Sequence, residues 1–195
     1  YSQLSSSFQR LEALKMVCDW ERKAYGEGMH RTPVVLKQCA EKSPDGLIFG
    51  VENGSVIGCL DIWNLTDHFY EELKLGIKAE EELCPEHITE HKREGNCWYI
   101  GSIITNPVIR SSKVDRRLSR DVFRAMFNAA QSFLQNQKPR DSRIMGVGSS
   151  DFGRKLLGDW GFSPVEKDKN CIDTRQRFEK KIIETKDVIY SLRSL

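Results

Sequence analysis

The chain has 195 residues, of which 39% are hydrophobic and 30% charged, and its formal net charge is +2. These proportions are ordinary for a globular protein, and the length suits one domain with a substantial core. No stretch approaches the roughly 18 consecutive apolar residues of a membrane span, which excludes a spanning helix, and no signal peptide precedes the first predicted helix. The small net charge argues neither for nor against nucleic acid, so any electrostatic signal has to be local.

The six cysteines are scattered along the chain. An even number of cysteines in a chain this long is weak evidence for disulfides, and two of them sit inside apolar patterns. We therefore expect free, mostly buried thiols and a cytoplasmic location. The first residue is Tyr1, which suggests a processed or excised piece of a longer protein.

The N-terminal half predicts two helices followed by three strands. Apolar residues at helical spacing predict a first helix ending near Tyr25 and a second at 32–41. Two strands, at 47–51 and 55–63, are joined by Asn53 and Gly54, which favour the positive φ angles of a type I′ turn. The pair is therefore predicted to be antiparallel. Continuous apolar character at 97–104 predicts a central strand.

A polar insertion, residues 64–96, separates the second strand from the third. It holds nine acidic and four basic residues, a net charge of −5. Phe69, Leu73 and Ile77 recur at helical spacing, so part of it is predicted to be a helix with one apolar side. A long insertion beside a central strand is often a lid or a partner surface.

The C-terminal half predicts a long amphipathic helix from 114 to 133, a strand at 143–148, a short helix at 152–160 and a strand at 175–183. A helical tail is expected at about 184–195. The order of elements indicates an α/β chain with a mixed sheet flanked by helices. We expect residues 1–195 to form a single domain.

The junction of the central strand and the long helix, residues 105–118, is the most informative segment. A strand that runs through a tight loop into a helix N-terminus makes an anion site, because the first-turn amides are unpaired and the helix dipole is positive there. The same segment resembles the acyl-CoA loop of the GNAT (GCN5-related N-acetyltransferase) superfamily, V-x-P-x-x-R-G-x-G-x-G-x-x-L. Thr105, Pro107, Arg110 and Leu118 match in register. The three glycine positions are occupied by Ser111, Lys113 and Asp115.

A second block, residues 150–162, resembles the GNAT segment N-x-x-A-x-x-L-Y-x-x-x-G-F. Leu156, Gly161 and Phe162 agree, while Ser150 stands for the asparagine. Leu157 occupies the position at which many members carry a tyrosine. The two blocks fall in the family's order, so the chain is similar to a divergent GNAT member.

The resemblance implies a splayed mixed sheet in which acyl-CoA lies between the strands at 97–105 and 143–148. Strand amides at Ile103 and Thr105 would hold the acyl and pantetheine carbonyls, and loop amides would hold the pyrophosphate. The cofactor-binding residues implied are Ile103, Ile104, Thr105, Arg110, Ser111, Ser112, Lys113, Val114, Asp115, Arg116 and Ser150. The co-substrate is acetyl-CoA or another acyl-CoA, and no metal is expected.

Asp115 is the serious departure from the family, because it sets a carboxylate near a bound pyrophosphate. A carboxylate at a helix N-terminus is stabilising in its own right and could substitute for the anion, which would close the site to CoA. Against this, six basic residues between 110 and 124 outnumber two acidic ones. That basic helix would attract the 3′-phosphate of CoA or the acidic face of an acyl carrier protein, or it is simply a solvated helix face. The aromatic residues form no stacking stripe with the arginines, so nucleic acid is a poor reading.

Acyl transfer to an amine needs a base for the nucleophile and an acid for the leaving thiolate. Leu157 cannot transfer a proton, so Tyr99 is a candidate acid. Asp61, on the strand that should flank the cleft, and Glu71, beyond its end, are candidate bases, each set against a purely structural role.

Three residues of the insertion, Cys84, His87 and His91, could also be taken for a metal cluster, but solvated histidines are the better interpretation.

Two hypotheses remain. The first is an N-acyltransferase that moves an acetyl or longer acyl group from CoA, or from an acyl carrier protein, to an amine by direct attack. The second is a catalytically inactive GNAT-like module used for protein interaction or ligand sensing, which Asp115 and Leu157 favour.

Overall fold

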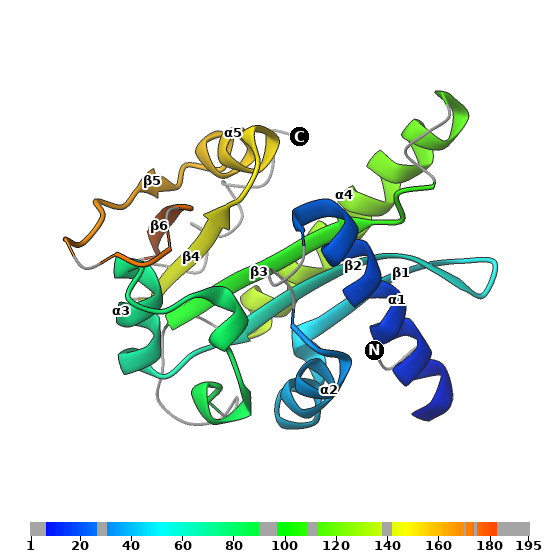
Figure 1. Ribbon diagram of the computed structural model, residues 1–195. Coiled ribbons are helices and arrows are strands. Elements are labelled where there is room, and N and C mark those ends of the chain that lie inside the picture. The colour runs from blue at the N-terminus through cyan, green and yellow to red at the C-terminus, as the bar shows by residue number, and fades with distance from the viewer. Residues whose placement is uncertain are drawn as a thin grey trace.

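A six-stranded mixed sheet forms the centre of the protein (Figure 1). The computed structural model describes residues 7–26, 31–89, 97–108, 113–137, 142–169, 171–173 and 175–182. Along the sheet the order is β1-β2-β3-β4-β6-β5. The strands are β1 (Leu47–Glu52), β2 (Ser55–Asn64), β3 (Cys97–Thr105), β4 (Ser142–Gly148), β5 (Ser163–Pro164) and β6 (Gln176–Ile182).

Only one pair of neighbouring strands in this sheet is parallel. β1 pairs with β2, β2 with β3, β4 with β6 and β5 with β6 in antiparallel fashion, whereas β3 and β4 are parallel. The β1–β2 turn has positive φ at both central residues, 48° at Asn53 and 75° at Gly54, as a type I′ turn requires. The predicted hairpin and the predicted central position of the third strand are confirmed.

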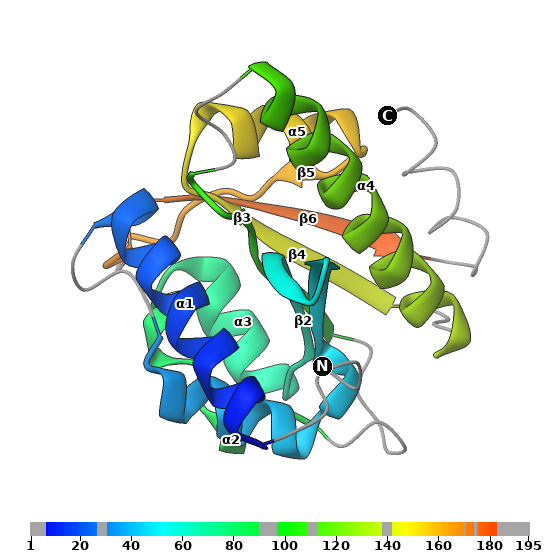
Figure 2. The same cartoon turned by 90° about the vertical axis from the view of Figure 1, so that its right-hand side faces the viewer.

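Helices cover both faces of the sheet (Figure 2). One face, called here the α1–α3 face, carries α1 (Ser7–Tyr25), α2 (Pro33–Lys42) and α3 (Asp67–Leu75). The other, the α4–α5 face, carries α4 (Lys113–Asn136) and α5 (Asp151–Asp159). Each face has its own hydrophobic core, and nine of the ten residues of β2 are buried. A strand buried on both sides shows a continuous apolar run, which is the pattern that the sequence displays.

Polar residues mark where several helices begin and end. Thr66 and Ser150 each accept a hydrogen bond at a helix N-cap, from the N–H groups of Phe69 and Gly153. α3 ends at Gly76, whose φ of 78° lies in the left-handed region. None of the described helices is long and apolar enough to cross a membrane.

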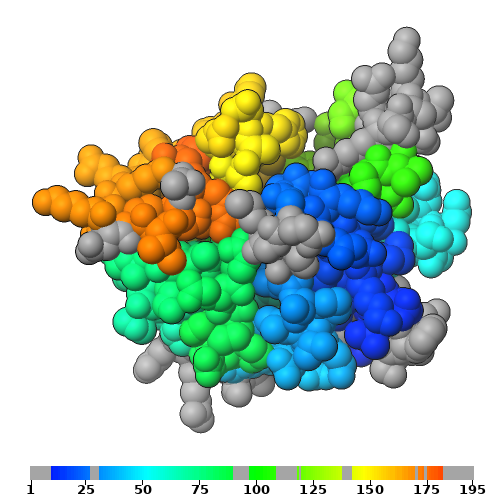
Figure 3. Space-filling view, viewed as in Figure 1, coloured from blue at the N-terminus to red at the C-terminus, as the bar shows by residue number. Residues whose placement is uncertain are grey.

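The described part of the insertion between β2 and β3, residues 65–89, packs against the sheet. It contains α3 and two 3₁₀ turns, η2 (Glu80–Glu82) and η3 (Pro85–His87), while a further 3₁₀ turn, η1 (Pro44–Gly46), precedes β1. Arg177 of β6 is buried and donates from Nε to the carbonyl of Leu73 (2.6 Å), one of the last of α3. In the space-filling view the insertion lies between the N-terminal helices and the C-terminal segment (Figure 3). The helical tail predicted at 184–195 lies outside the described residues.

The six cysteines all lie in the described residues and are free thiols. Four of them are buried: Cys18, Cys39, Cys59 and Cys97. Burial raises the pKa of Cys18 and of Cys39 to about 12. These thiols are therefore protonated packing groups at neutral pH.

Candidate functional site

The parallel strands β3 and β4 pair over only half of their length. Cys97 lies opposite Arg143 and Ile100 opposite Gly146, and beyond that pair the two strands continue without further pairing. Figure 1 shows β4 turning away from β3 toward α5. A cavity of about 800 Å³ occupies this opening. It is called here the interstrand cavity.

A β-bulge in β3 lies beside this opening. Leu60 of β2 pairs with Ile103, and Ile62 pairs with Ile100, so that two residues of β3, Gly101 and Ser102, lie opposite the single intervening residue, Asp61. A bulge bends its strand and increases the local twist. It therefore helps to direct β3 away from β4 at the point where their pairing ends.

The carboxylate of Asp61 holds the bulge in place. Its Oδ2 accepts a hydrogen bond from the N–H of Ser102 (2.9 Å). A Cβ atom at Gly101 would lie 2.0 Å from Asp61 Oδ1, so only glycine fits beneath the carboxylate. Arg31, from the segment before α2, binds both carboxylate oxygens, at 3.1 and 2.6 Å, and Trp63 Nε1 donates to Oδ1 (2.6 Å).

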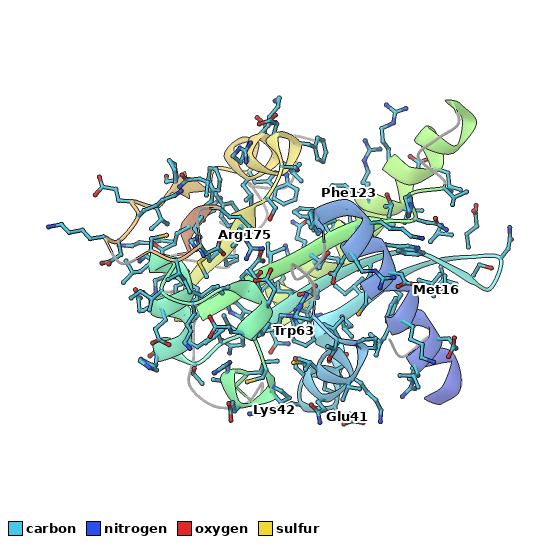
Figure 4. The ribbon with its side chains drawn as sticks, in the orientation of Figure 1. Met16, Glu41, Lys42, Trp63, Phe123 and Arg175 are labelled. Carbon is cyan, nitrogen blue, oxygen red and sulfur yellow. The ribbon has the colours of Figure 1, made fainter. Side chains whose placement is uncertain are left out.

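The α4–α5 side of the interstrand cavity is aromatic with a basic rim. Phe123 of α4 and Phe152 of α5 line it, and their ring centroids are 6.4 Å apart. The rim holds Arg120 and Arg124 from α4, together with Lys155, which pairs with Asp159. Figure 4 labels Phe123, and also Arg175, which lines the cavity from the segment before β6.

The α1–α3 side of the cavity is rich in carboxylates. The charged residues that line it are Glu21, Arg31, Glu80, Glu81 and Arg175. Glu80 and Glu81 belong to η2, so the acidic insertion reaches the cavity through this turn. Burial raises the pKa of Glu80 to about 8, although Arg175 and Arg31 act to lower it. The cavity thus crosses the sheet, with a basic rim on one face and buried carboxylates on the other.

Two residues that line the cavity each carry a buried polar atom with no hydrogen-bond partner within the described part of the chain. The two atoms are the hydroxyl oxygen of Ser102 and the indole Nε1 of Trp160. Buried polar groups in folded proteins are nearly always paired, with protein, water or a ligand. Both residues therefore carry unmet hydrogen-bonding capacity beside the cavity.

Solved structures of similar fold were found, although no protein-family model matches the sequence and no curated protein matches it significantly. Ard1 from Thermoplasma volcanium has a TM-score of 0.53 at 12% identity, over 89% of this chain and 94% of that one. PH1933 from Pyrococcus horikoshii OT3 gives 0.52 at 16%, over 89% and 90%. The GphF GNAT-like decarboxylase, in complex with isobutyryl-CoA, gives 0.54 at 13%, over 88% and 95%.

The chain has the GNAT fold. The mixed, splayed sheet predicted from the two sequence blocks is confirmed, and so is the resemblance on which it rested. At these identities the likeness establishes the fold and nothing finer.

Four residues of the predicted GNAT cofactor site line the interstrand cavity: Ile103, Ile104, Thr105 and Ser150. The N–H groups of Ser102 and Asn106 both point toward β2, where they donate hydrogen bonds. Because successive N–H groups of a strand point to alternate sides, those of Ile103 and Thr105 point toward the opening. This is the direction that the predicted carbonyl contacts need. Ser150 also caps α5, since its hydroxyl accepts from Gly153 N–H (3.0 Å).

The GNAT loop itself is only partly described. Arg110, Ser111 and Ser112 lie outside the described residues. The stretch from Lys113 to Arg116, which includes Val114 and Asp115, forms the first turn of α4. Its contact with a pyrophosphate remains a prediction.

Leu157 lies where the resemblance predicts a tyrosine, and it lines the interstrand cavity. It is buried and packs against Gly146, since a Cβ added to that glycine would lie 2.8 Å from Leu157 Cδ2. An apolar side chain therefore occupies the position for which the resemblance predicts the acid.

The three candidate catalytic residues do not line the interstrand cavity. Asp61 is 2% exposed, and four donors occupy its carboxylate. Glu71 pairs with Arg143, at the end of β4 where the strands are still paired. Tyr99 is 1% exposed within the core of the α1–α3 face. We therefore assign none of the three as the base or acid.

The charged residues of the α1–α3 side were missed as site residues by sequence reasoning. The acids at 80–82 were counted only as part of the insertion's charge, and Arg175 as the start of a strand. Arg175 pairs with Glu80 and Glu81 across about 95 residues of sequence, a separation at which no local pattern operates. The one usable signal was a run of three acids next to an apolar helix face.

Part of the suggested metal cluster is also described. Cys84, Glu86 and His87 bring one ligand atom each within 4.8 Å of one another, while His91 lies outside the described residues. His87 stacks on Phe69, with ring centroids 3.8 Å apart, and its Nδ1 accepts from Cys84 N–H (3.3 Å). These contacts give the turn a structural role, and burial lowers the pKa of His87.

Proposed function

We propose that this protein is an N-acyltransferase that moves an acetyl or longer acyl group from CoA to an amine by direct attack. The observation that carries the proposal is the interstrand cavity. It crosses the sheet where β3 and β4 separate, with a basic rim on one face and carboxylates on the other. A polyanionic donor and an amine acceptor could approach such a cavity from opposite faces. We also propose that the protein acts in the cytoplasm.

The donor would lie on the α4–α5 side. Arg120 and Arg124 would attract its phosphates, and the first-turn amides of α4 would bind the pyrophosphate. The similar GphF protein holds isobutyryl-CoA, which supports an acyl-CoA donor. An acyl carrier protein is the alternative donor, since its acidic surface would complement the same basic helix.

In the reaction, the amine nitrogen attacks the thioester carbonyl carbon. A C–N bond forms and the C–S bond breaks, the nitrogen loses a proton and the thiolate gains one. The N–H groups of Ile103 and Thr105, which point into the opening, would stabilise the oxyanion.

The alternative is a GNAT-like module without catalytic activity, used for protein interaction or ligand sensing. Asp115 and Leu157 favour it, because one sets a carboxylate in the pyrophosphate loop and the other replaces the usual acid. The two functions differ in whether a CoA thioester binds and turns over.

Calorimetry with acetyl-CoA and with a long-chain acyl-CoA tests the proposal directly. We expect one of them to bind. We also expect Asp115→Asn to tighten binding about two- to fivefold, because about 0.5–1 kcal/mol of like-charge repulsion is removed. Asp121→Asn removes the same charge further along α4 and serves as the matched control. If the folded protein binds neither thioester, the CoA-dependent function is refuted, and a labelled acyl carrier protein then tests the other donor.

A further inference from the structure

The α1–α3 side of the interstrand cavity has two arginines, and both are already occupied by carboxylates. Arg175 donates from Nε to Asp173, from Nη1 to Glu80 (2.8 Å) and Glu81 (2.9 Å), and from Nη2 to Glu81 and Asp173. A guanidinium has five N–H donors, so these contacts saturate it. Arg175 is therefore not available to bind a carboxylate of a substrate.

Arg31 is committed in the same way. Both of its terminal nitrogens donate to Asp61, and Nη2 also lies 3.8 Å from Glu21 Oε1. Its side chain is 7% exposed. The two arginines on this side of the cavity thus pair with acidic side chains of the protein itself.

The carboxylates remain in excess after this pairing. Glu21, Glu80 and Glu81 line the cavity against two arginines, so this side carries an excess of one negative charge once Glu80 is ionised. Behind them, Asp61 and Asp173 outnumber the buried Arg177. A buried carboxylate excess attracts a cation, and an amine is a cation at neutral pH.

Glu80 is the member of this group best placed to meet an amine. It accepts from Arg175 through Oε2 only, and its Oε1 accepts no hydrogen bond within the described residues. Its side chain is 17% exposed and lines the cavity. The charged groups that face it come from every neighbouring element: Glu21 of α1, Arg31, Asp61 of β2, Glu81, Asp173 and Arg175.

We propose that the acceptor is a cationic amine with no carboxylate next to its reacting nitrogen, and that Glu80 accepts a proton from that nitrogen. This inference rests on the acyl transfer proposed above. An α-amino acid is disfavoured, because its carboxylate would enter a cavity end whose two arginines are already paired with carboxylates of the protein. Glu80 Oε1 takes one proton from the ammonium group before attack, which frees the nitrogen lone pair, and later returns that proton to solvent. The second proton that the nitrogen loses as the amide forms balances the one gained by the leaving thiolate.

The pH dependence follows from the same arrangement. Burial raises the pKa of Glu80 to about 8, so the free protein reaches its basic form only as the pH approaches 8. A base has to be unprotonated, and kcat/KM should therefore rise with pH up to about 8. A bound ammonium group stabilises the carboxylate form of Glu80. In the pH profile of kcat the rise should therefore occur at lower pH than in the profile of kcat/KM.

The test compares tyramine with L-tyrosine, which differ only by the α-carboxylate. Binding of each to the free and the CoA-loaded full chain is measured by calorimetry, and acetyl transfer by thiol release. We expect tyramine to bind and react at least tenfold better. Equal or better use of L-tyrosine, or no binding of tyramine to either form, overturns the inference.

Two variants of the same 3₁₀ turn identify the base. Glu80→Gln should lower kcat/KM for tyramine at least about 100-fold, with acetyl-CoA affinity unchanged and the rise toward pH 8 lost. Glu82→Gln is the matched control, since Glu82 is exposed, pairs with Lys78 and does not line the cavity. Glu80→Asp, which keeps the charge, should restore part of the rate, and an unchanged rate in Glu80→Gln overturns the role of Glu80.

The outcomes separate this inference from the proposed function. If the protein binds acetyl-CoA but binds and acetylates both amines equally well, the acyltransferase function is supported and this inference is refuted. If the protein binds no acyl donor but prefers tyramine, and Glu80→Gln loses that preference, the cation site is supported and the acyltransferase function is refuted.

Discussion

Asp61→Asn is expected to destabilise the protein strongly, because the carboxylate stands at the centre of a buried network. Arg31 is 7% exposed and Asp61 3% in their side chains, so the substitution leaves a buried guanidinium without its bidentate partner. Breaking such a pair from one side costs about 3–5 kcal/mol. The new amide group would also face N–H donors from Trp63 and Ser102. Glu21, 3.8 Å from Arg31, offsets part of the loss.

Urea unfolding followed by tryptophan fluorescence measures this effect. With a slope of about 2 kcal/mol per molar urea, a loss of about 4 kcal/mol lowers the midpoint by about 2 M. Asp159→Asn is the control, because its partner Lys155 is exposed and such pairs contribute about 0–1 kcal/mol. The combination Arg31→Met with Asp61→Leu should cost less than the sum of the two single changes.

The same experiment separates a structural role of Asp61 from a catalytic one. A loss below about 1 kcal/mol in Asp61→Asn contradicts the account of the buried network given above. If that stable variant also lost turnover, the base predicted for Asp61 from the sequence would return to consideration.

Three further predictions concern other positions. Gly101→Ala should lower the free energy of unfolding by about 1–3 kcal/mol in thermal or urea unfolding, because the new Cβ would meet Asp61 Oδ1. Gly158→Ala in α5 should raise it by about 0.5–1 kcal/mol, because a Cβ at this position has no atom within 4 Å. Glu80→Gln should gain stability relative to the natural protein as the pH rises from 5 to 8. The reason is that the folded natural protein retains the Glu80 proton over this window, whereas its unfolded chain releases it. The relative gain in the free energy of unfolding is at most about 1.4 kcal/mol per pH unit. A gain that appears instead as the pH falls contradicts this prediction. Arg124→Ala should weaken acetyl-CoA binding in calorimetry less at 0.5 M salt than at 0.05 M, because screening reduces the attraction of the rim, and a loss independent of salt contradicts that role.

Local patterns were enough to predict most of the fold. The Asn53-Gly54 pair fixed an antiparallel hairpin, and the apolar period along α4 gave a helix that the structure has at Lys113–Asn136. The joint register of two blocks placed β3 and β4 side by side and parallel. The turn and helix signals are local, so spacing alone determines which side chains share a face, whereas the parallel pairing was implied by the resemblance of the two blocks.

The site was less predictable because its charged groups meet over long separations. Asp61 has the side chain and the strand position expected of a catalytic base. Its partner Arg31, however, lies 30 residues earlier, in a segment without hydrophobic periodicity. Tyr99 lies in a strand that is apolar on both faces, so alternation could not tell which face it occupies. The bulge at Gly101 and Ser102 has no sequence signature other than the glycine.

The contact between Asp61 and Gly101 also constrains the order in which this sequence can change over time. While position 61 carries a carboxylate bound to Arg31, no side chain fits at position 101. A substitution at 101 thus becomes acceptable only after the ion pair has been replaced. The three positions should therefore vary together among descendants of this chain, although they come from three different parts of the sequence.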